Sequence, residues 1–114
     1  MKKMICICLL LVLCVVILSG CSKAPYIGTF SGKNPLGYDT TVTIKDDGTI
    51  NYATKYSEVA GKWSKMSDSQ ISASFYGHYY DAEPLIITVS ADKNTITISS
   101  DYSGWTNEYF DRAK

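Results

Sequence analysis

A two-residue alternation of apolar and polar side chains, repeated from Tyr26 onward, is the feature that most constrains the fold. Successive side chains of a β-strand point to opposite faces, so this period is typical of strands that are buried on one face only. No window of the same region shows the 3.6-residue period of an amphipathic helix. The alternation therefore predicts an all-β domain.

Short polar segments divide this alternation at nearly regular intervals. Asp46-Asp47-Gly48 and Ala91-Asp92-Lys93-Asn94 are typical of tight turns between antiparallel strands. The eight expected strands are residues 26–31, 41–45, 49–52, 59–64, 71–75, 85–90, 95–99 and 105–112. Eight short strands joined in sequence predict a small antiparallel up-and-down barrel or a strongly curled meander, because closure of the sheet removes its exposed edges.

The alternation also predicts which side chains face the interior. The expected inward set is Tyr26, Phe30, Val42, Ile44, Ile50, Tyr52, Trp63, Ile71, Phe75, Leu85, Ile87, Val89, Ile96 and Ile98. Trp63 and Phe75 are interpreted as core residues, because an eight-stranded barrel is just wide enough for side chains or one small ligand. In the last segment, the sequence leaves open which of Trp105, Tyr109 and Phe110 faces inward.

Four short segments carry a family resemblance. They are Tyr26-Ile27-Gly28-Thr29-Phe30, Asp46-Asp47-Gly48-Thr49, Gly61-Lys62-Trp63 and Phe110-Asp111-Arg112. Together they resemble the small lipocalin-like barrels found in many bacterial lipoproteins of unassigned role. The resemblance implies a lipocalin-like β-barrel over residues 26–114 and no particular activity. True lipocalins are longer, so large calyx loops are not expected.

The first twenty residues have a different character. A basic start, Met1-Lys2-Lys3, precedes fifteen apolar residues at positions 4–18, fewer than the about twenty that a membrane-spanning helix needs. Leu18-Ser19-Gly20-Cys21 follows and resembles the lipobox of bacterial lipoprotein precursors. This resemblance implies a signal peptide over residues 1–20, lipidation of Cys21 and a short tether over 21–25. An ordinary signal peptide that contains a cysteine is the alternative.

Cysteine usage favours the lipoprotein interpretation. Cys6, Cys8 and Cys14 lie in the segment that would be removed, which leaves Cys21 alone and excludes an internal disulfide. Several acyl chains on one residue bind a membrane stably, whereas one binds marginally. We therefore expect attachment to the extracytoplasmic face of the cell membrane or of an outer membrane, through lipid on Cys21.

The charge balance constrains the partners. Without Lys2 and Lys3, residues 21–114 contain nine Lys and Arg residues against eleven Asp and Glu, a net charge near −2. Nucleic-acid-binding domains need a basic surface, so no nucleic-acid partner is expected.

The sequence offers little support for catalysis. His78 is the only histidine, which excludes a His-rich metal site, and no serine stands out as an activated nucleophile. Asp46-Asp47-Gly48 lacks the downstream glutamate of a calcium loop, and Asp81 and Glu83 are too isolated to be a glycosidase pair. We therefore expect no enzyme, no metal and no cofactor.

Tyrosines gather in alternate connections. In an up-and-down barrel, the connections at residues 33–40, 55–57, 77–84 and 101–104 share the end opposite the termini, and the connections at 46–48, 65–70 and 91–94 share the other. The first set contains Tyr38, Tyr56, His78, Tyr79, Tyr80 and Tyr102, which are five of the nine tyrosines and the only histidine. Tyrosine combines a large rigid contact surface with a polar tip, which suits recognition. The alternative is that these rings merely cap a small core.

The resulting hypothesis is a membrane-anchored, non-enzymatic module that binds a protein or an envelope component through this aromatic rim. Two alternatives remain open at this point. One is a carrier or sensor of a small apolar ligand at the barrel mouth, and the other is a small inhibitor of an envelope-targeting hydrolase.

Overall fold

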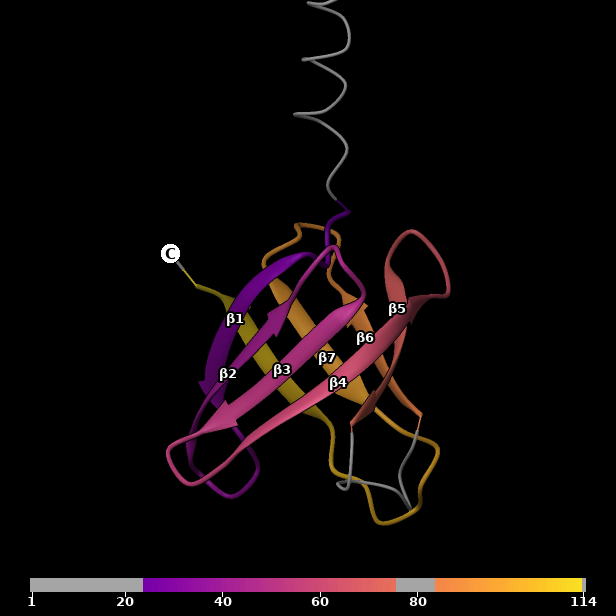
Figure 1. Cartoon of the computed structure of the whole chain (residues 1–114). Helices are drawn as coiled ribbons and strands as arrows, with labels where there is room; N and C mark the ends of the chain where they lie inside the picture. The colour runs from indigo at the N-terminus through magenta and orange to yellow at the C-terminus, as the bar shows by residue number, and fades with distance from the viewer. Residues whose placement is uncertain (1–23, 76–83, 114) are drawn as a thin grey trace, which may run out of the picture.

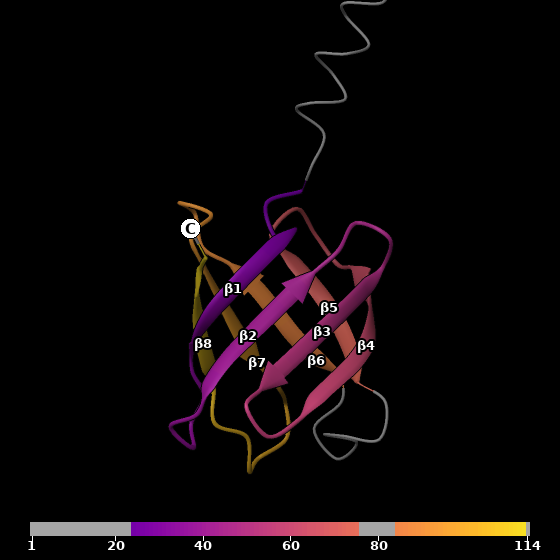
Figure 2. The same cartoon turned by 60° about the vertical axis from the view of Figure 1, so that its left-hand side comes forward.

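The computed structural model describes residues 24–75 and 84–113, and these form a barrel of antiparallel strands (Figures 1 and 2). The strands are β1 (Gly28–Lys33), β2 (Asp39–Ile44), β3 (Thr49–Thr54), β4 (Glu58–Lys65), β5 (Gln70–Phe75), β6 (Leu85–Val89), β7 (Thr95–Ser99) and β8 (Glu108–Arg112). Each strand pairs with its neighbours in sequence, and β8 pairs with β1. The predicted all-β arrangement of eight strands is confirmed, and it takes the form of a closed barrel.

The predicted alternation is visible in β2, where Thr40, Val42 and Ile44 are buried and the residues between them face outward. β-branched side chains are favoured on such a surface because they pack against their cross-strand neighbours. Val42 lies opposite Phe30 on β1 and opposite Tyr52 on β3. The strand registers therefore carry a row of inward apolar side chains from strand to strand.

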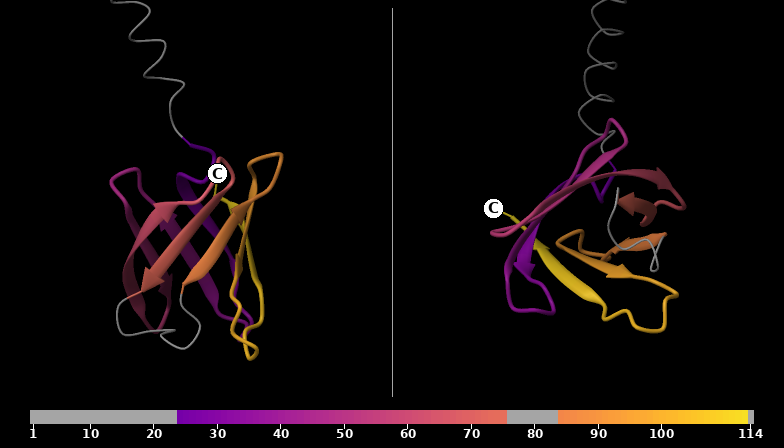
Figure 3. Two further views of the ribbon diagram at one scale, coloured as in Figure 1. Left: turned by 90° about the vertical axis from the view of Figure 1, so that its right-hand side faces the viewer. Right: turned by 60° about the horizontal axis from the view of Figure 1, so that its bottom comes forward.

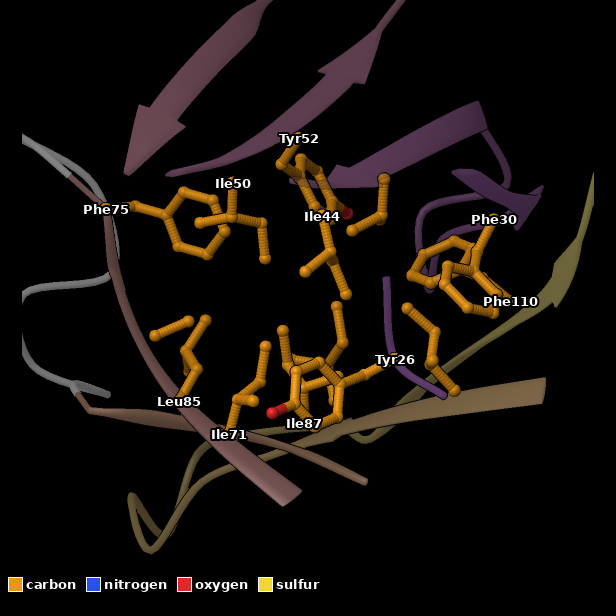
Figure 4. Packing of buried hydrophobic residues seen from close by; sticks show 14 of the residues in the cluster. Tyr26, Phe30, Ile44, Ile50, Tyr52, Ile71, Phe75, Leu85, Ile87 and Phe110 are labelled. Atoms are coloured by element: carbon orange, nitrogen blue, oxygen red, sulfur yellow. The ribbon is translucent and has the colours of Figure 1, made fainter. Parts of the chain in front are cut away.

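The core lies inside the ring of strands (Figure 4). Every residue of the expected inward set except Trp63 is buried. The described residues add Val59, Ala73 and Phe110 to the apolar core, together with the polar side chains of Thr40 and Glu108. Full burial of one large apolar side chain is worth about 1.5–3 kcal/mol, so this cluster is the main source of stability.

The prediction that Trp63 is a core residue is wrong in part. Trp63 is half-buried, and its ring packs edge-on against Tyr26 with the ring centroids 5.3 Å apart. Its indole N–H donates to the backbone oxygen of Lys45 at 2.8 Å. A tryptophan ring needs a partner for this polar group, and the end of the barrel provides one. Trp63 therefore caps the core.

The expected first strand begins two residues too early. Tyr26 lies in a turn in which the amide of Ile27 donates to the oxygen of Ala24 at 3.1 Å, although the Tyr26 side chain is buried as predicted. The turn ends at Gly28, whose φ of +140° is unfavourable for other residues. The chain thus folds over the end of the barrel before it enters β1.

Arg112 fixes this leading turn. Its guanidinium donates to the backbone oxygens of Pro25 at 2.5 Å and Ile27 at 3.0 Å, and to that of Lys93 at 2.9 Å. The same group lies 4.6 Å from the centre of the Phe30 ring. One side chain of β8 therefore ties the leading turn to β1 and to the β6–β7 connection.

The expected last strand also begins too early, because β8 starts at Glu108. Trp105 lies in the preceding connection. Its amide donates to the backbone oxygen of Tyr102 at 3.0 Å, and its indole N–H donates to the backbone oxygen of Ile98 at 3.1 Å. Phe110 is the residue that faces inward, whereas Tyr109 is exposed.

The connections alternate between the two ends of the barrel, as predicted (Figure 3). We call the end at which the described chain begins the proximal end. It also carries the β2–β3, β4–β5 and β6–β7 connections (Figure 1). The opposite, distal end carries the β1–β2, β3–β4 and β7–β8 connections. Residues 24–75 and 84–113 contain no helix that is long and apolar enough to cross a membrane.

Candidate functional site

Two tyrosines meet at the distal end. The rings of Tyr38 and Tyr56 pack edge to face, with their centroids 4.9 Å apart and their planes at 72°. Tyr38 precedes β2 and Tyr56 follows β3. The register that places Thr40 opposite Thr54 brings the β1–β2 and β3–β4 connections side by side. We call Tyr38 and Tyr56 the aromatic pair.

The β1–β2 connection is organised by Asn34. Its side-chain oxygen accepts hydrogen bonds from the amides of Leu36 and Tyr38, both at 3.0 Å, as in a typical Asx turn. Gly37 takes a φ of +85°, which glycine adopts more easily than other residues. The connection therefore holds Tyr38 in place and leaves Leu36 with 76% of its surface exposed.

The β3–β4 connection is organised by Thr54. Its hydroxyl oxygen accepts hydrogen bonds from the amides of Tyr56 and Ser57, both at 3.2 Å. The ammonium of Lys55 lies 4.9 Å from the centre of the Tyr56 ring, a cation–π contact. Tyr56 is thus held by Lys55 and Tyr38 while 68% of its surface stays exposed.

Tyr102 belongs to the separate β7–β8 connection and is 47% exposed. Its amide donates to the hydroxyl of Ser100 at 3.1 Å. Its ring lies directly against Gly104, where an added Cβ would come within 2.7 Å of the ring. Tyr102 is therefore held by contacts within its own connection.

The structure thus places Tyr38, Tyr56 and Tyr102 at the distal end, where the sequence predicted them, and brings the first two into contact. Cys21, His78, Tyr79 and Tyr80, the other residues of the predicted sites, lie outside the described residues. Sequence reasoning overlooked Leu36 and Lys55. An apolar residue between Pro35 and Gly37, in a segment with every mark of a turn, was a signal for the exposed Leu36.

A hollow lies beside the aromatic pair on the outer face of β1, β2 and β3. Its volume is about 530 Å³, and it is lined by Ser31, Gly32, Lys33, Asp39, Thr40, Thr41, Ala53, Thr54 and Lys55. We call it the β1–β3 groove. The ammonium of Lys33 contacts Oδ1 of Asp39 at 2.7 Å within it. This hydrogen bond, and then the charge of Lys33, lower the pKa of Asp39 below its ordinary value, so its carboxylate is ionised at neutral pH.

A polar pair lies inside the barrel. The hydroxyl of Tyr52 donates to Oε1 of Glu108 at 2.5 Å, and both side chains are buried. The Tyr52 ring packs edge-on against Phe75 and Phe110, with centroid distances of 6.2 Å in each case. Burial raises the pKa of Glu108 above its ordinary value, and the hydrogen bond from Tyr52 opposes part of that rise.

Comparison with known proteins adds no family to this description. No model of a known protein family matches the chain, and no curated protein matches it. Within residues 24–75 and 84–113, no three His, Cys, Asp or Glu side chains are grouped so that they could hold a metal ion. The absence of a cofactor stays a prediction.

Proposed function

We propose that this chain is a lipid-anchored protein that works outside the cytoplasm and binds a protein or an envelope component with its distal end. One observation carries the proposal: the described chain begins at the proximal end (Figure 1), and the exposed Tyr56 and Tyr102 lie in connections at the opposite end. A lipid attached close to the proximal end would direct these tyrosines away from the membrane.

The tether implied by the lipobox is short. Residues 22–25 lie between Cys21 and the buried Tyr26 and span about 14 Å when fully extended. The last of them, Pro25, is held by Arg112. Lipid on Cys21 would therefore hold the proximal end close to the bilayer, and a partner would meet the distal end first.

The distal end has the properties of a recognition surface. Tyr56 and Leu36 are among the most exposed large apolar side chains of the described residues, and both belong to connections that are held by internal hydrogen bonds. A surface that is already ordered loses less conformational entropy when it binds. Rigid aromatic rings with polar tips are common in such surfaces.

Photo-crosslinking in intact cells tests the proposal. A photoreactive residue would replace Leu36 at the distal end or, as a matched control, Met66, which is 53% exposed in the β4–β5 connection at the proximal end. We expect a discrete crosslinked product from position 36, none of the same size from position 66, and loss of the product when Tyr56→Ser is added. Equal products from both positions, or no product from position 36, would contradict the proposal.

The polar pair inside the barrel favours a second candidate, a carrier of a small ligand. Tyr52 and Glu108 form a hydrogen-bonded polar pair in a mostly apolar interior and would orient the polar end of a bound molecule. Native mass spectrometry of the gently purified protein separates the two candidates. A stoichiometric added mass would favour the carrier, and the bare mass would favour recognition at the distal end.

A further inference from the structure

We infer that the β1–β3 groove and the aromatic pair together form a binding site for an oligosaccharide. The inference rests on the proposed function and deepens it, because it names the chemical class of the envelope component that is bound. It depends on the shape of the groove, on its polar groups and on the position of the tyrosine rings.

The shape follows from the strand register. Ser31 lies opposite Thr41, and Thr41 lies opposite Ala53, so short outward side chains meet on three adjacent strands. The longer side chains of Lys33 and Lys55 line the same hollow. Its volume of about 530 Å³ lies within the usual range of small-molecule sites. One face of a sugar ring can approach such a floor closely.

The polar groups of the groove match those of a sugar. Lys33 and Lys55 supply hydrogen-bond donors, and the hydroxyl of Thr41 both donates and accepts. Asp39 uses Oδ1 to accept from Lys33, and its Oδ2 has no hydrogen-bond partner among the described residues. Sugar hydroxyls both donate and accept, and charged partners make the stronger of these bonds.

The aromatic pair supplies an apolar surface next to these polar groups. Lys55 joins the two, because it lines the groove and its ammonium lies 4.9 Å from the centre of the Tyr56 ring. Aromatic rings attract the positively polarised edges of other groups to their faces, and the C–H bonds on one side of a sugar ring are such groups. Tyr56 is exposed and already oriented by Lys55 and Tyr38, so it offers this surface without rearrangement.

An extended peptide fits this face less well. β1, β2 and β3 are each paired on both edges within the closed barrel, so they have no free edge to which a further strand could be added. The side chains that line the groove are Ser, Thr, Ala, Lys and Asp, with Gly32 between them. They offer no deep apolar pocket for the large anchoring side chains that dominate protein interfaces.

The test is NMR titration of the full-length protein in detergent with three tetrasaccharides, of N-acetylglucosamine, glucose and galactose. We expect at least one to shift the amide signals of Ser31, Thr41 and Lys55 in a saturable manner. The three arms distinguish an amino-sugar glycan from a neutral polysaccharide. Tyr56→Ser should weaken the binding about tenfold, and Tyr56→Phe, which keeps the ring, should bind almost normally.

Tyr109→Ser is the matched control, because Tyr109 is 60% exposed on β8 and does not line the groove. It should bind like the wild type. The inference fails if no tetrasaccharide shifts the groove signals, or if Tyr56→Ser and Tyr109→Ser weaken binding equally. If the molecule crosslinked to position 36 is identified by mass spectrometry as a polypeptide, the proposed function stands and the oligosaccharide inference is overturned.

Discussion

The hydroxyl of Tyr52 on β3 donates a 2.5 Å hydrogen bond to Oε1 of Glu108 on β8, so two distant parts of the chain are joined across the interior of the barrel. A carboxyl group in an apolar core is costly when it is charged, and a single neutral donor offsets only part of that cost. The pair therefore makes the stability of the barrel depend on pH.

Glu108→Gln should remove this pH dependence. Because burial raises the pKa of Glu108, the folded state binds its proton more tightly than the unfolded state does. The free energy of unfolding should fall as the pH rises from about 4.5, the ordinary value, through the raised value in the folded state. Urea denaturation of wild type and Glu108→Gln at a series of pH values measures the difference. The stability of Glu108→Gln relative to wild type should increase as the pH rises. A difference in unfolding free energy that stays constant with pH would show that Glu108 titrates normally.

Comparison with Glu108→Gln also separates the contribution of Glu108 to the pH dependence of stability from the contributions of the surface carboxyl groups. Hydrogen bonds from neighbouring side chains lower the pKa of Asp39, Asp47 and Asp92, with Lys33, Thr49 and Ser90 as the respective main causes. These exposed groups act in the opposite direction and favour folding as the pH rises toward their ordinary value. Their effect is common to both proteins and cancels in the difference.

Tyr52→Phe should destabilise the barrel by about 1–3 kcal/mol, because it leaves the buried carboxyl of Glu108 without its donor. Since the hydrogen bond from Tyr52 lowers the pKa of Glu108, this variant should also raise that pKa further. The double variant with Glu108→Gln should cost less than the sum of the two single changes. Additive costs in urea denaturation would mean that the two side chains act independently.

Arg112→Met should loosen the leading turn at the proximal end. The change keeps an unbranched apolar stem but removes the hydrogen bonds to the backbone oxygens of Pro25, Ile27 and Lys93, with an expected loss of about 1.5–3 kcal/mol. Hydrogen exchange should accelerate most at the amide of Ile27. Lys65→Met is the control, because Lys65 makes only an exposed ion pair and should change stability by less than about 1 kcal/mol.

Gly61→Ala should destabilise the β4–β5 pair. A Cβ at Gly61 would lie within 2.5 Å of the backbone oxygen of Ser74 and 3.0 Å from the Phe75 ring, so the two strands would have to separate. We expect a loss of about 1–3 kcal/mol. Ala60→Ser, at the adjacent exposed position, should lie within about 0.5 kcal/mol of wild type. Similar melting temperatures for both variants would contradict the close packing at Gly61.

Cys21→Ser should abolish lipidation. Cells fed a labelled fatty acid should incorporate the label into the wild type and into Cys14→Ser, but not into Cys21→Ser. If the lipobox directs cleavage, Cys21→Ser should also migrate as the longer, uncleaved chain. Label retained in Cys21→Ser would contradict the proposed anchor.

Local patterns were sufficient to predict most of the barrel. Alternation and turn residues locate the strands, and the alternation of connections places Tyr38, Tyr56 and Tyr102 at one end. The last strand was harder because residues 105–112 do not alternate cleanly, and this is why Glu108 was overlooked as an interior residue.

Features that depend on distant contacts could not be predicted from local patterns. The contact between Tyr38 and Tyr56 requires the register of β2 and β3, and the β1–β3 groove requires side chains from three strands to be placed together. Trp63 follows the inward alternation, but it lies at the end of the barrel. There its indole N–H donates a hydrogen bond to the backbone oxygen of Lys45, and its side chain is only half-buried.

The central claim is that the membrane anchor and the binding surface lie at opposite ends of the barrel. Bilayer quenching of a fluorophore tests it directly, with the dye attached through Ser67→Cys in the proximal β4–β5 connection or Ser57→Cys in the distal β3–β4 connection. In membranes that contain a lipid-borne quencher, we predict strong quenching at position 67 and weak quenching at position 57. Equal quenching at both positions, or stronger quenching at position 57, would contradict the account.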